Sequence, residues 1–275
     1  MRRRNFIALT ALGATGFAAN GLPVLGKEGG IQRIQSSELK ADLVIAGAGV
    51  GGCAAALSAL RNGLTVIMTE ETDWIGGQLT SQGVPPDEHI WIETHGAPAS
   101  YRNYRTAVRN YYKTHYPITA QAKSKEHLNP GNAVVSELCH EPRVSLAVLN
   151  ELLAPYISSG KLTLMIEHQV ISADYSGNRV RALKVISLHT GNETILVAPY
   201  FVDATEMGDL LPLTGTEFVT GTESRNDTRE LHAPEKADPD NHQAFTMCFA
   251  MDYQPGTNNV GQKPAEYEFW KNLVP

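Results

Sequence analysis

Short apolar runs flank a helical segment in the first part of the chain and predict a strand, a helix and a second strand. Residues 43–46 form an apolar run of the kind found in buried parallel strands. Residues 54–60 are small and apolar, as in a helix that packs on a sheet, and Gly63 follows at a C-cap position. A second apolar run, residues 64–69, ends at Glu70. This order predicts an α/β fold with a parallel sheet.

Two longer segments have the spacing of amphipathic helices. Residues 100–116 are rich in Tyr and Arg, and their helical spacing indicates that most of the tyrosines pack in a core. Residues 144–154 follow Pro142, a residue favoured at a helix start. Pro155 is predicted to end or kink this second helix, because proline lacks a backbone N–H and clashes with the preceding turn.

Four alternating, β-branched segments then predict a small antiparallel meander. They are residues 162–166, 169–175, 180–188 and 193–197. Residues 200–205 predict a short buried strand that returns to the parallel sheet. Residues 223–242 are polar, contain two prolines and predict a long surface excursion that could act as a lid.

A glycine-rich turn joins the first predicted strand to its helix. Gly47, Gly49 and Gly52 fit the pattern G-x-G-x-x-G. The first glycine permits the tight turn, the second lets a pyrophosphate approach the backbone, and the third lets the helix lie close to the strand. Glu70, at the end of the second strand, is placed to accept hydrogen bonds from ribose hydroxyls and disfavours a 2′-phosphate. A glycine-rich turn of an unrelated α/β protein is the alternative, and the strand–turn–helix context argues against it.

The N-terminus has the features of an export signal. Residues 3–7, Arg-Arg-Asn-Phe-Ile, resemble a twin-arginine signal, and an apolar stretch over residues 8–25 follows. Glycines and Pro23 interrupt that stretch, which favours a processed signal over an anchor. Cleavage near Ala18 and cleavage near Gly26 both fit, and an uncleaved anchor is the alternative.

Composition excludes several classes of function. The chain of 275 residues has a formal net charge of −6, and removal of the signal also removes three arginines. An acidic protein is a poor nucleic-acid binder, because phosphate contact needs a basic surface. The three cysteines, Cys53, Cys139 and Cys248, are too widely spaced for a disulfide framework or a CxxC site. Beyond the signal, no apolar run reaches the length of a membrane span.

Candidate chemistry lies in the loops. Gly76 and Gly77 follow Glu70 in the sequence and suggest that the backbone there runs close to a ligand. His140, in a Cys-His-Glu-Pro loop before a helix, is the candidate base, and a capping or packing role is the alternative. Another cluster, His89, Glu93 and His95, has a spacing that fits no specific metal site, so we predict no metal.

Taken together, these motifs resemble those of FAD-dependent oxidoreductases of the glutathione-reductase type. The resemblance covers about residues 41–275 and includes the glycine motif, the segment 75–82, Cys139-His-Glu-Pro and Asp203-Ala-Thr-Glu-Met-Gly-Asp. In such flavoproteins an Ala-Thr-Gly strand passes beside the bound dinucleotide, and here Glu206 replaces that glycine. The position of Val170 resembles one whose backbone touches the adenine.

The resemblance implies a Rossmann-like FAD-binding domain and FAD as the cofactor. The implied cofactor contacts are Gly47, Ala48, Gly49, Val50, Gly51, Gly52, Glu70, Glu71, Gly76, Gly77, Gln78, Leu79, Thr80, Val170, Ala204, Thr205, Gly208 and Asp209. The implied reaction is oxidation of a small organic substrate by hydride transfer to the flavin, with an unidentified electron acceptor. An NAD-binding dehydrogenase is the alternative, which Gly51, the Gly76–Gly77 pair and Asp203-Ala-Thr disfavour.

We therefore expect four parts. They are a signal (1–26), a linker (27–40), an FAD-binding domain (41–222) with a helical insertion (about 97–160) and a meander (about 161–197), and the start of a lid region (223–275). No later Gly-Asp segment is visible for the ribityl and pyrophosphate, so we expect the N-terminal part of a longer enzyme. A naturally short member of the family and a truncated, non-catalytic fragment are the alternatives. Expected partners are the substrate, the electron acceptor and the twin-arginine translocase during export to the periplasm or outside.

Overall fold

A computed structural model describes residues 37–249 and 252–273. The predicted signal, residues 1–26, lies outside the described residues, as does most of the predicted linker. The last part of that linker is not a linker, because Ser37–Lys40 forms strand β1.

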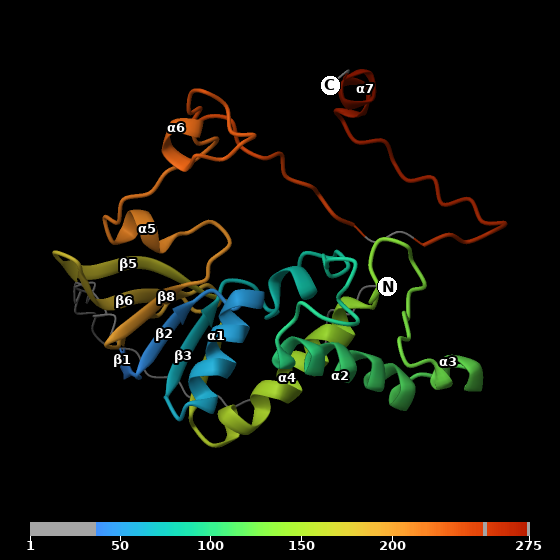
Figure 1. The fold of residues 1–275 in the computed structure, drawn as a ribbon, viewed down its shortest axis with the longest axis horizontal. Helices are drawn as coiled ribbons and strands as arrows, with labels where there is room; N and C mark the ends of the chain where they lie inside the picture. Colours follow the sequence, from blue (N-terminus) through green and yellow to red (C-terminus); the bar gives the residue numbers. More distant parts are fainter. Residues whose placement is uncertain (1–36, 250–251, 274–275) are drawn as a thin grey trace, which may run out of the picture. The chain divides into compact units, whose positions relative to one another are not determined.

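A parallel sheet of four strands forms the centre of the fold (Figure 1). Its strand order is β4-β3-β2-β8, and every neighbouring pair is parallel. The strands are β2 (Leu43–Ala46), β3 (Val66–Glu70), β4 (Leu162–Ile166) and β8 (Tyr200–Asp203). Helix α1 (Val50–Arg61) connects β2 to β3, as predicted from the hydrophobic pattern.

One predicted strand belongs to a different sheet than expected. The prediction that residues 162–166 open the meander is wrong, because β4 pairs with β3 in parallel register, from Val66 opposite Leu162 to Glu70 opposite Ile166. An alternating run of five residues does not by itself distinguish a parallel from an antiparallel partner. Here the preceding helix α4 (Pro142–Ser158) makes β4 the strand of a crossover connection, which is the usual way to join parallel strands.

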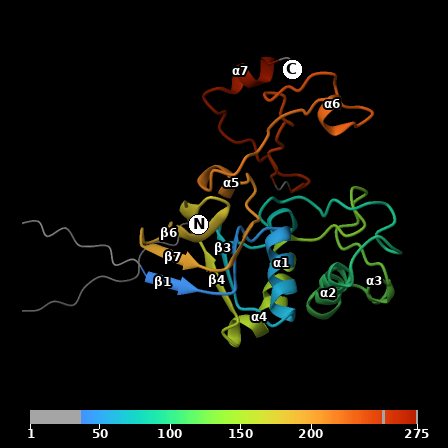
Figure 2. The ribbon, with the colours of Figure 1, turned by 60° about the vertical axis from the view of Figure 1, so that its left-hand side comes forward.

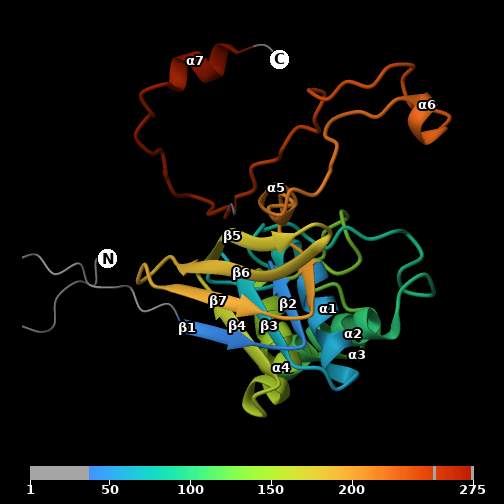
Figure 3. The ribbon, with the colours of Figure 1, turned by 90° about the vertical axis from the view of Figure 1, so that its left-hand side faces the viewer.

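The second sheet contains the other three predicted meander strands and β1. It has four strands in the order β1-β7-β6-β5, and Figure 3 shows these strands side by side. The antiparallel strands are β5 (His168–Ser176), β6 (Arg179–Ser187) and β7 (Glu193–Val197). Strand β1 runs parallel to β7, with Leu39 opposite Leu196.

The helical segments α2 (Ala99–His115) and α4 agree with the expected amphipathic helices. Helix α3 (Ala120–Ser124) is a short addition in between. Pro142 lies in the first turn of α4, as predicted, but Pro155 does not end the helix, which continues to Ser158.

The two faces of the parallel sheet bury different partners. Ile45 and Met68 belong to one core with residues of α1, α2 and α4. Val44 and Ile67 point to the opposite face and pack with Leu183 and other residues of the second sheet. This alternation is the two-residue period of a strand, and it explains why a sheet covered on both faces needs continuous apolar runs. Figure 2 shows α1 and α4 beside the parallel strands.

Four short elements complete the description. They are η1 (Gly77–Leu79), α5 (Leu210–Leu213), α6 (Arg225–Thr228) and α7 (Tyr267–Asn272). The predicted polar excursion contains α6, and an isolated bridge joins Thr222 to Asp238. Among residues 37–249 and 252–273, no helix is both long and apolar enough to cross a membrane.

Candidate functional site

The glycine turn after β2 admits no side chain at two of its positions. Gly47 has φ +90°, and a Cβ there would lie 2.2 Å from the carbonyl oxygen of Ala204 on the neighbouring strand connection. A Cβ on Gly52 would lie 2.1 Å from the carbonyl oxygen of Gly47. The turn is therefore held between α1 and the segment after β8, and only glycine permits this packing.

The N-terminus of α1 opens into this turn. Gly49 is the N-cap residue and supplies no side-chain cap to the first free backbone N–H groups. Helix N-termini carry unpaired donors and a partial positive charge, so they favour phosphate. Cys53 lies one turn further on, and burial, followed by the charge of Glu70, raises the pKa of its thiol to about 12. That thiol stays protonated and packs in the core.

Glu70 ties the turn to the end of β3. Its Oε2 accepts a hydrogen bond from the backbone N–H of Ala48 at 2.9 Å. Its Oε1 accepts from the N–H and the hydroxyl of Thr72, at 3.0 and 2.9 Å. Each carboxylate oxygen can accept more than one hydrogen bond, so the group can still bind ribose hydroxyls.

Two cavities flank the glycine turn. The strand-end cavity has a volume of about 150 Å³ and lies where β2, β3 and β8 end. It is lined by Gly47, Thr69, Glu70, Glu71, Thr72, His168, Val170, Ala204, Thr205, Glu206, Met207 and Asp209. The turn cavity, of about 340 Å³, is lined by Gly49, Val50, Gly51, Gln78, Gln82, Ala204, Thr205 and Glu206. A ligand site at the carboxyl ends of parallel strands is the usual arrangement in this fold class.

Most of the predicted contacts meet at these cavities. Seven line the strand-end cavity: Gly47, Glu70, Glu71, Val170, Ala204, Thr205 and Asp209. Six line the turn cavity: Gly49, Val50, Gly51, Gln78, Ala204 and Thr205. The other predicted residues line neither, namely Ala48, Gly52, Gly76, Gly77, Leu79, Thr80 and Gly208.

Several of the residues outside the linings support the turn from behind. The N–H of Gly76 donates to the carbonyl of Ala48 at 2.7 Å. The hydroxyl of Thr80 donates to the carbonyl of Ile75 at 2.5 Å. A Cβ on Gly77 would lie 3.1 Å from the Cα of Gly49, so the two loops are in close contact. These residues position the turn, whereas the cavity-lining residues are the ones that can contact a ligand.

Asp203 organises the segment that follows β8. Its Oδ1 accepts from the N–H and the hydroxyl of Thr205, at 3.1 and 2.7 Å. Its Oδ2 accepts from the N–H of Leu210 at 2.9 Å, and the Thr205 hydroxyl accepts from the N–H of Asp209 at 2.8 Å. The Asp-Ala-Thr motif therefore acts through its hydrogen bonds to its own backbone, which hold Ala204 against the glycine turn.

Some cavity-lining residues were not among the predicted contacts. They include Glu206 and His168. Glu206 stood out in the sequence only as a departure from the Ala-Thr-Gly pattern. The position of His168 depends on the second sheet meeting the end of the parallel sheet, and no local motif signals this.

His140 lies in a different place, beside Tyr104 and Ser145. Its Nδ1 is 2.8 Å from the carbonyl oxygen of Leu138. A carbonyl only accepts, so Nδ1 carries the proton and Nε2, 3.4 Å from the Tyr104 hydroxyl, is free to accept. That hydroxyl also pairs with the hydroxyl of Ser145. Burial lowers the pKa of His140 and so favours the neutral ring of a base.

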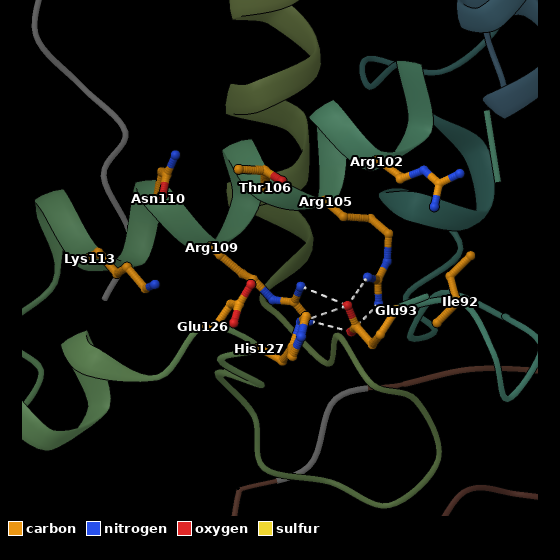
Figure 4. A pocket seen from close by; sticks show the side chains of 10 residues that line it. All are labelled: Ile92, Glu93, Arg102, Arg105, Thr106, Arg109, Asn110, Lys113, Glu126 and His127. Atoms are coloured by element: carbon orange, nitrogen blue, oxygen red, sulfur yellow. Dashed lines mark hydrogen bonds and ion pairs between the residues drawn. The ribbon is translucent and has the colours of Figure 1, made fainter. Parts of the chain in front are cut away.

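The Glu93 side chain has different partners from those its sequence neighbours suggested. Glu93 lines a third cavity of about 310 Å³, the arginine cavity (Figure 4). Arg105 and Arg109, from α2, both bind it, with contacts of 2.8 and 2.5 Å, and His127 approaches within 3.0 Å. His89 and His95 do not take part in this cluster. Among the described residues, no group of three or more His, Cys, Asp or Glu side chains is arranged to hold a metal.

Comparison with known proteins assigns the chain to a family. The family model described as "FAD dependent oxidoreductase" matches residues 42–273. The chain belongs to the FAD-dependent oxidoreductase family. This match includes both cavities, and it makes FAD the cofactor and a Rossmann-type FAD-binding domain the fold.

Solved structures similar to this family member are distant in sequence. L-proline dehydrogenase from P. horikoshii is 17% identical, with a TM-score of 0.34, and the match covers 62% of this chain and 23% of that one. Mycobacterium smegmatis Sdh1 is 14% identical, with a TM-score of 0.41, over 62% of this chain and 34% of that one. The myxobacterial chondrochloren halogenase CndH is 15% identical, with a TM-score of 0.39, and the match covers 60% of this chain and 37% of that one.

The chain thus spans well under half the length of these structures. Among curated proteins, the sequence has no significant match. The geometry of the site nevertheless fits the ADP half of FAD. The glycine turn lies at the N-terminus of α1, and the carboxylate of Glu70 lies at the end of the next strand, β3.

Proposed function

We propose that this chain binds FAD at the glycine turn and forms part of an oxidoreductase that oxidises a small organic substrate. The single observation that carries the proposal is the turn itself. Gly47 and Gly52 admit no side chain, and the uncapped N-terminus of α1 opens into a cavity of about 340 Å³. The family match supplies the identity of the cofactor.

Each group at the site has a role in binding. The first N–H groups of α1 receive the pyrophosphate, and Gly49 lets it approach the backbone. Glu70 receives the ribose hydroxyls, and Val170, in the strand-end cavity, lies against the adenine. When bound, FAD supplies the redox chemistry by accepting a hydride from the substrate.

Binding of FAD is tested with the 275-residue chain by titration against the change in flavin fluorescence, together with a visible spectrum. The matched variants are Gly49→Ala, which adds a Cβ at the phosphate position, and Gly261→Ala, where a Cβ meets nothing within 4 Å. We expect Gly49→Ala to weaken FAD binding by about tenfold or more, and Gly261→Ala to leave it unchanged. Tight binding of NAD without FAD would support the dehydrogenase alternative instead.

His140 is proposed as the base that removes a substrate proton. It has a neutral ring with a free Nε2 and contacts the buried Tyr104, although it lines neither cavity at the glycine turn. The base acts in its neutral form, and burial lowers its pKa, so the rate should fall only at a pH below the ordinary value of about 6.5.

The test of this role uses any substrate identified by a screen for flavin reduction. His140→Gln is expected to lower the rate at every pH by about 100-fold. It should also remove the fall in rate at low pH, which is the acid limb of the pH–rate profile. The exposed His189→Gln serves as the control. A His140→Gln profile that keeps the wild-type acid limb would assign the limb to another group.

The export signal and the partners belong to the same proposal. A twin-arginine route carries folded proteins and suits a flavoprotein that is loaded before export. The electron acceptor and the translocase are the proposed partners. The formal net charge of −6 argues against nucleic acid.

A further inference from the structure

Glu206 places a carboxylate where the glycine turn is open. A Cβ on Gly49 would lie 3.0 Å from the Glu206 Oε1, and a Cβ on Gly77 would lie 2.9 Å from the same atom. The oxygen therefore lies over the bare Cα atoms of two glycines from two different loops. The second glycine of this motif is bare so that the pyrophosphate can approach the backbone. Glu206 thus lies against the position that the pyrophosphate takes.

The electrostatics of the site make this position significant. Glu206 lines both cavities, and among the described residues neither lining contains Lys or Arg. Glu70, Glu71 and Asp209 add further acidic groups to the strand-end cavity. Burial, followed by the charge of Asp209, raises the pKa of Glu71, as expected where carboxyl groups gather. The backbone N–H groups at the N-terminus of α1 therefore supply favourable charge for the phosphates.

The backbone near Glu206 is held, whereas its side chain is not. Four hydrogen bonds fix the segment after β8: two join Asp203 to Thr205, and the backbone N–H groups that follow donate two more to these side chains. Within residues 37–249 and 252–273, the Glu206 carboxylate has no hydrogen-bond or ion-pair partner, and the residue is exposed. Rotation about its side-chain bonds can move the carboxylate away without moving the strand.

We propose that Glu206 is an affinity-determining residue that occupies the phosphate position of the cofactor-free turn and must move aside when the dinucleotide binds. The proposal rests on the proposed FAD site and concerns the residue that sets its affinity. Two negative groups a few ångströms apart repel each other, and the carboxylate also competes for the same helix N-terminus. Removing the charge should therefore tighten binding of ligands that carry a pyrophosphate.

The experiment compares the 275-residue chain with Glu206→Gln, Glu206→Gly and the exposed control Glu217→Gln. FAD, ADP and adenosine are titrated by calorimetry, after circular dichroism and thermal melts show that all four proteins are folded. We expect Glu206→Gln to bind FAD and ADP about tenfold more tightly, a difference of about 1.4 kcal/mol. Glu206→Gly should match or exceed this gain, and Glu217→Gln should bind as the wild type does. Adenosine has no phosphate, so its affinity should not change.

The other outcomes separate this inference from the proposed function. If the wild type binds FAD and Glu206→Gln binds it equally well or more weakly, Glu206 does not oppose the phosphates and the inference is overturned. A gain in adenosine affinity equal to the gain for ADP would place the effect away from the phosphates, with the same consequence. If none of the four proteins binds FAD, the proposed function fails and the inference fails with it.

Discussion

Glu93 shows how a single buried charge can connect a loop to a helix. The side chain is 18% exposed and receives hydrogen bonds from both Arg105 and Arg109 on α2. Arg105 also pairs with Glu88, whose side chain is 4% exposed. A charge at this depth is stable only when it is paired and hydrogen-bonded, so these contacts fix the loop before α2 in one position.

The Glu93 pKa makes this contribution depend on pH. Burial raises the pKa, but the hydrogen bonds and charges of Arg105 and Arg109 outweigh burial and lower it to about 2, from an ordinary value of 4.5. A carboxyl with a lowered pKa in the folded state stabilises the fold above its unfolded pKa. The contribution of Glu93 to the free energy of unfolding is fully present at pH 7, and it is lost as the pH falls from about 4.5 towards 2.

The prediction is tested by urea unfolding at pH 7, 5 and 3. Glu93→Gln should lower the free energy of unfolding at pH 7 by about 3 kcal/mol, because it leaves two buried arginines short of a partner. The variant should lose less stability than the wild type between pH 5 and pH 3. Glu126→Gln, on the exposed rim of the same cavity, is the control and should follow the wild type. Equal pH dependence in wild type and Glu93→Gln would contradict the assigned role.

At the level of elements, local patterns identified the strands and helices better than their partners. Strand β2, the turn, α1 and β3 follow directly from the apolar runs and the glycine spacing, because each rule acts within a few residues. Strand β4 was recognised as a strand but assigned to the meander, since its partner β3 is distant in the chain, with Val66 opposite Leu162. Strand β1 was missed because its four residues pair with β7, which lies still further along the chain, with Ser37 opposite Thr194.

The candidate site divides in the same way. Positions inside the motif, such as Gly47 and Gly49, were predicted from spacing, and the structure brings them to the cavities. Gly76 and Thr80 were also chosen from sequence, but their contacts are with the backbone behind the turn. The Glu206 carboxylate over the turn depends on how the segment after β8 folds back, and only the three-dimensional structure shows it.

At the scale of the whole molecule, the N-terminal sequence and the cofactor site support a single interpretation. A dinucleotide held between α1, the loop after β3 and the segment after β8 needs all three segments folded before it can bind. Such a protein is best loaded where FAD is made and then exported in the folded state. We propose that the paired arginines within residues 3–7 direct the chain to this route.

The export proposal gives the last prediction, tested by cell fractionation of the 275-residue chain in a bacterial host that has the twin-arginine translocase. Changing both Arg3 and Arg4 to Lys keeps the positive charge but removes the arginine pair, so the protein should stay in the cytoplasm. The single change Arg2→Lys leaves the pair intact and should be exported like the wild type. If the double variant is exported as well as the Arg2→Lys control, the route does not depend on the pair, because charge alone would then suffice for targeting. The FAD content of the exported wild-type fraction, read from its visible spectrum, would further show whether loading precedes export.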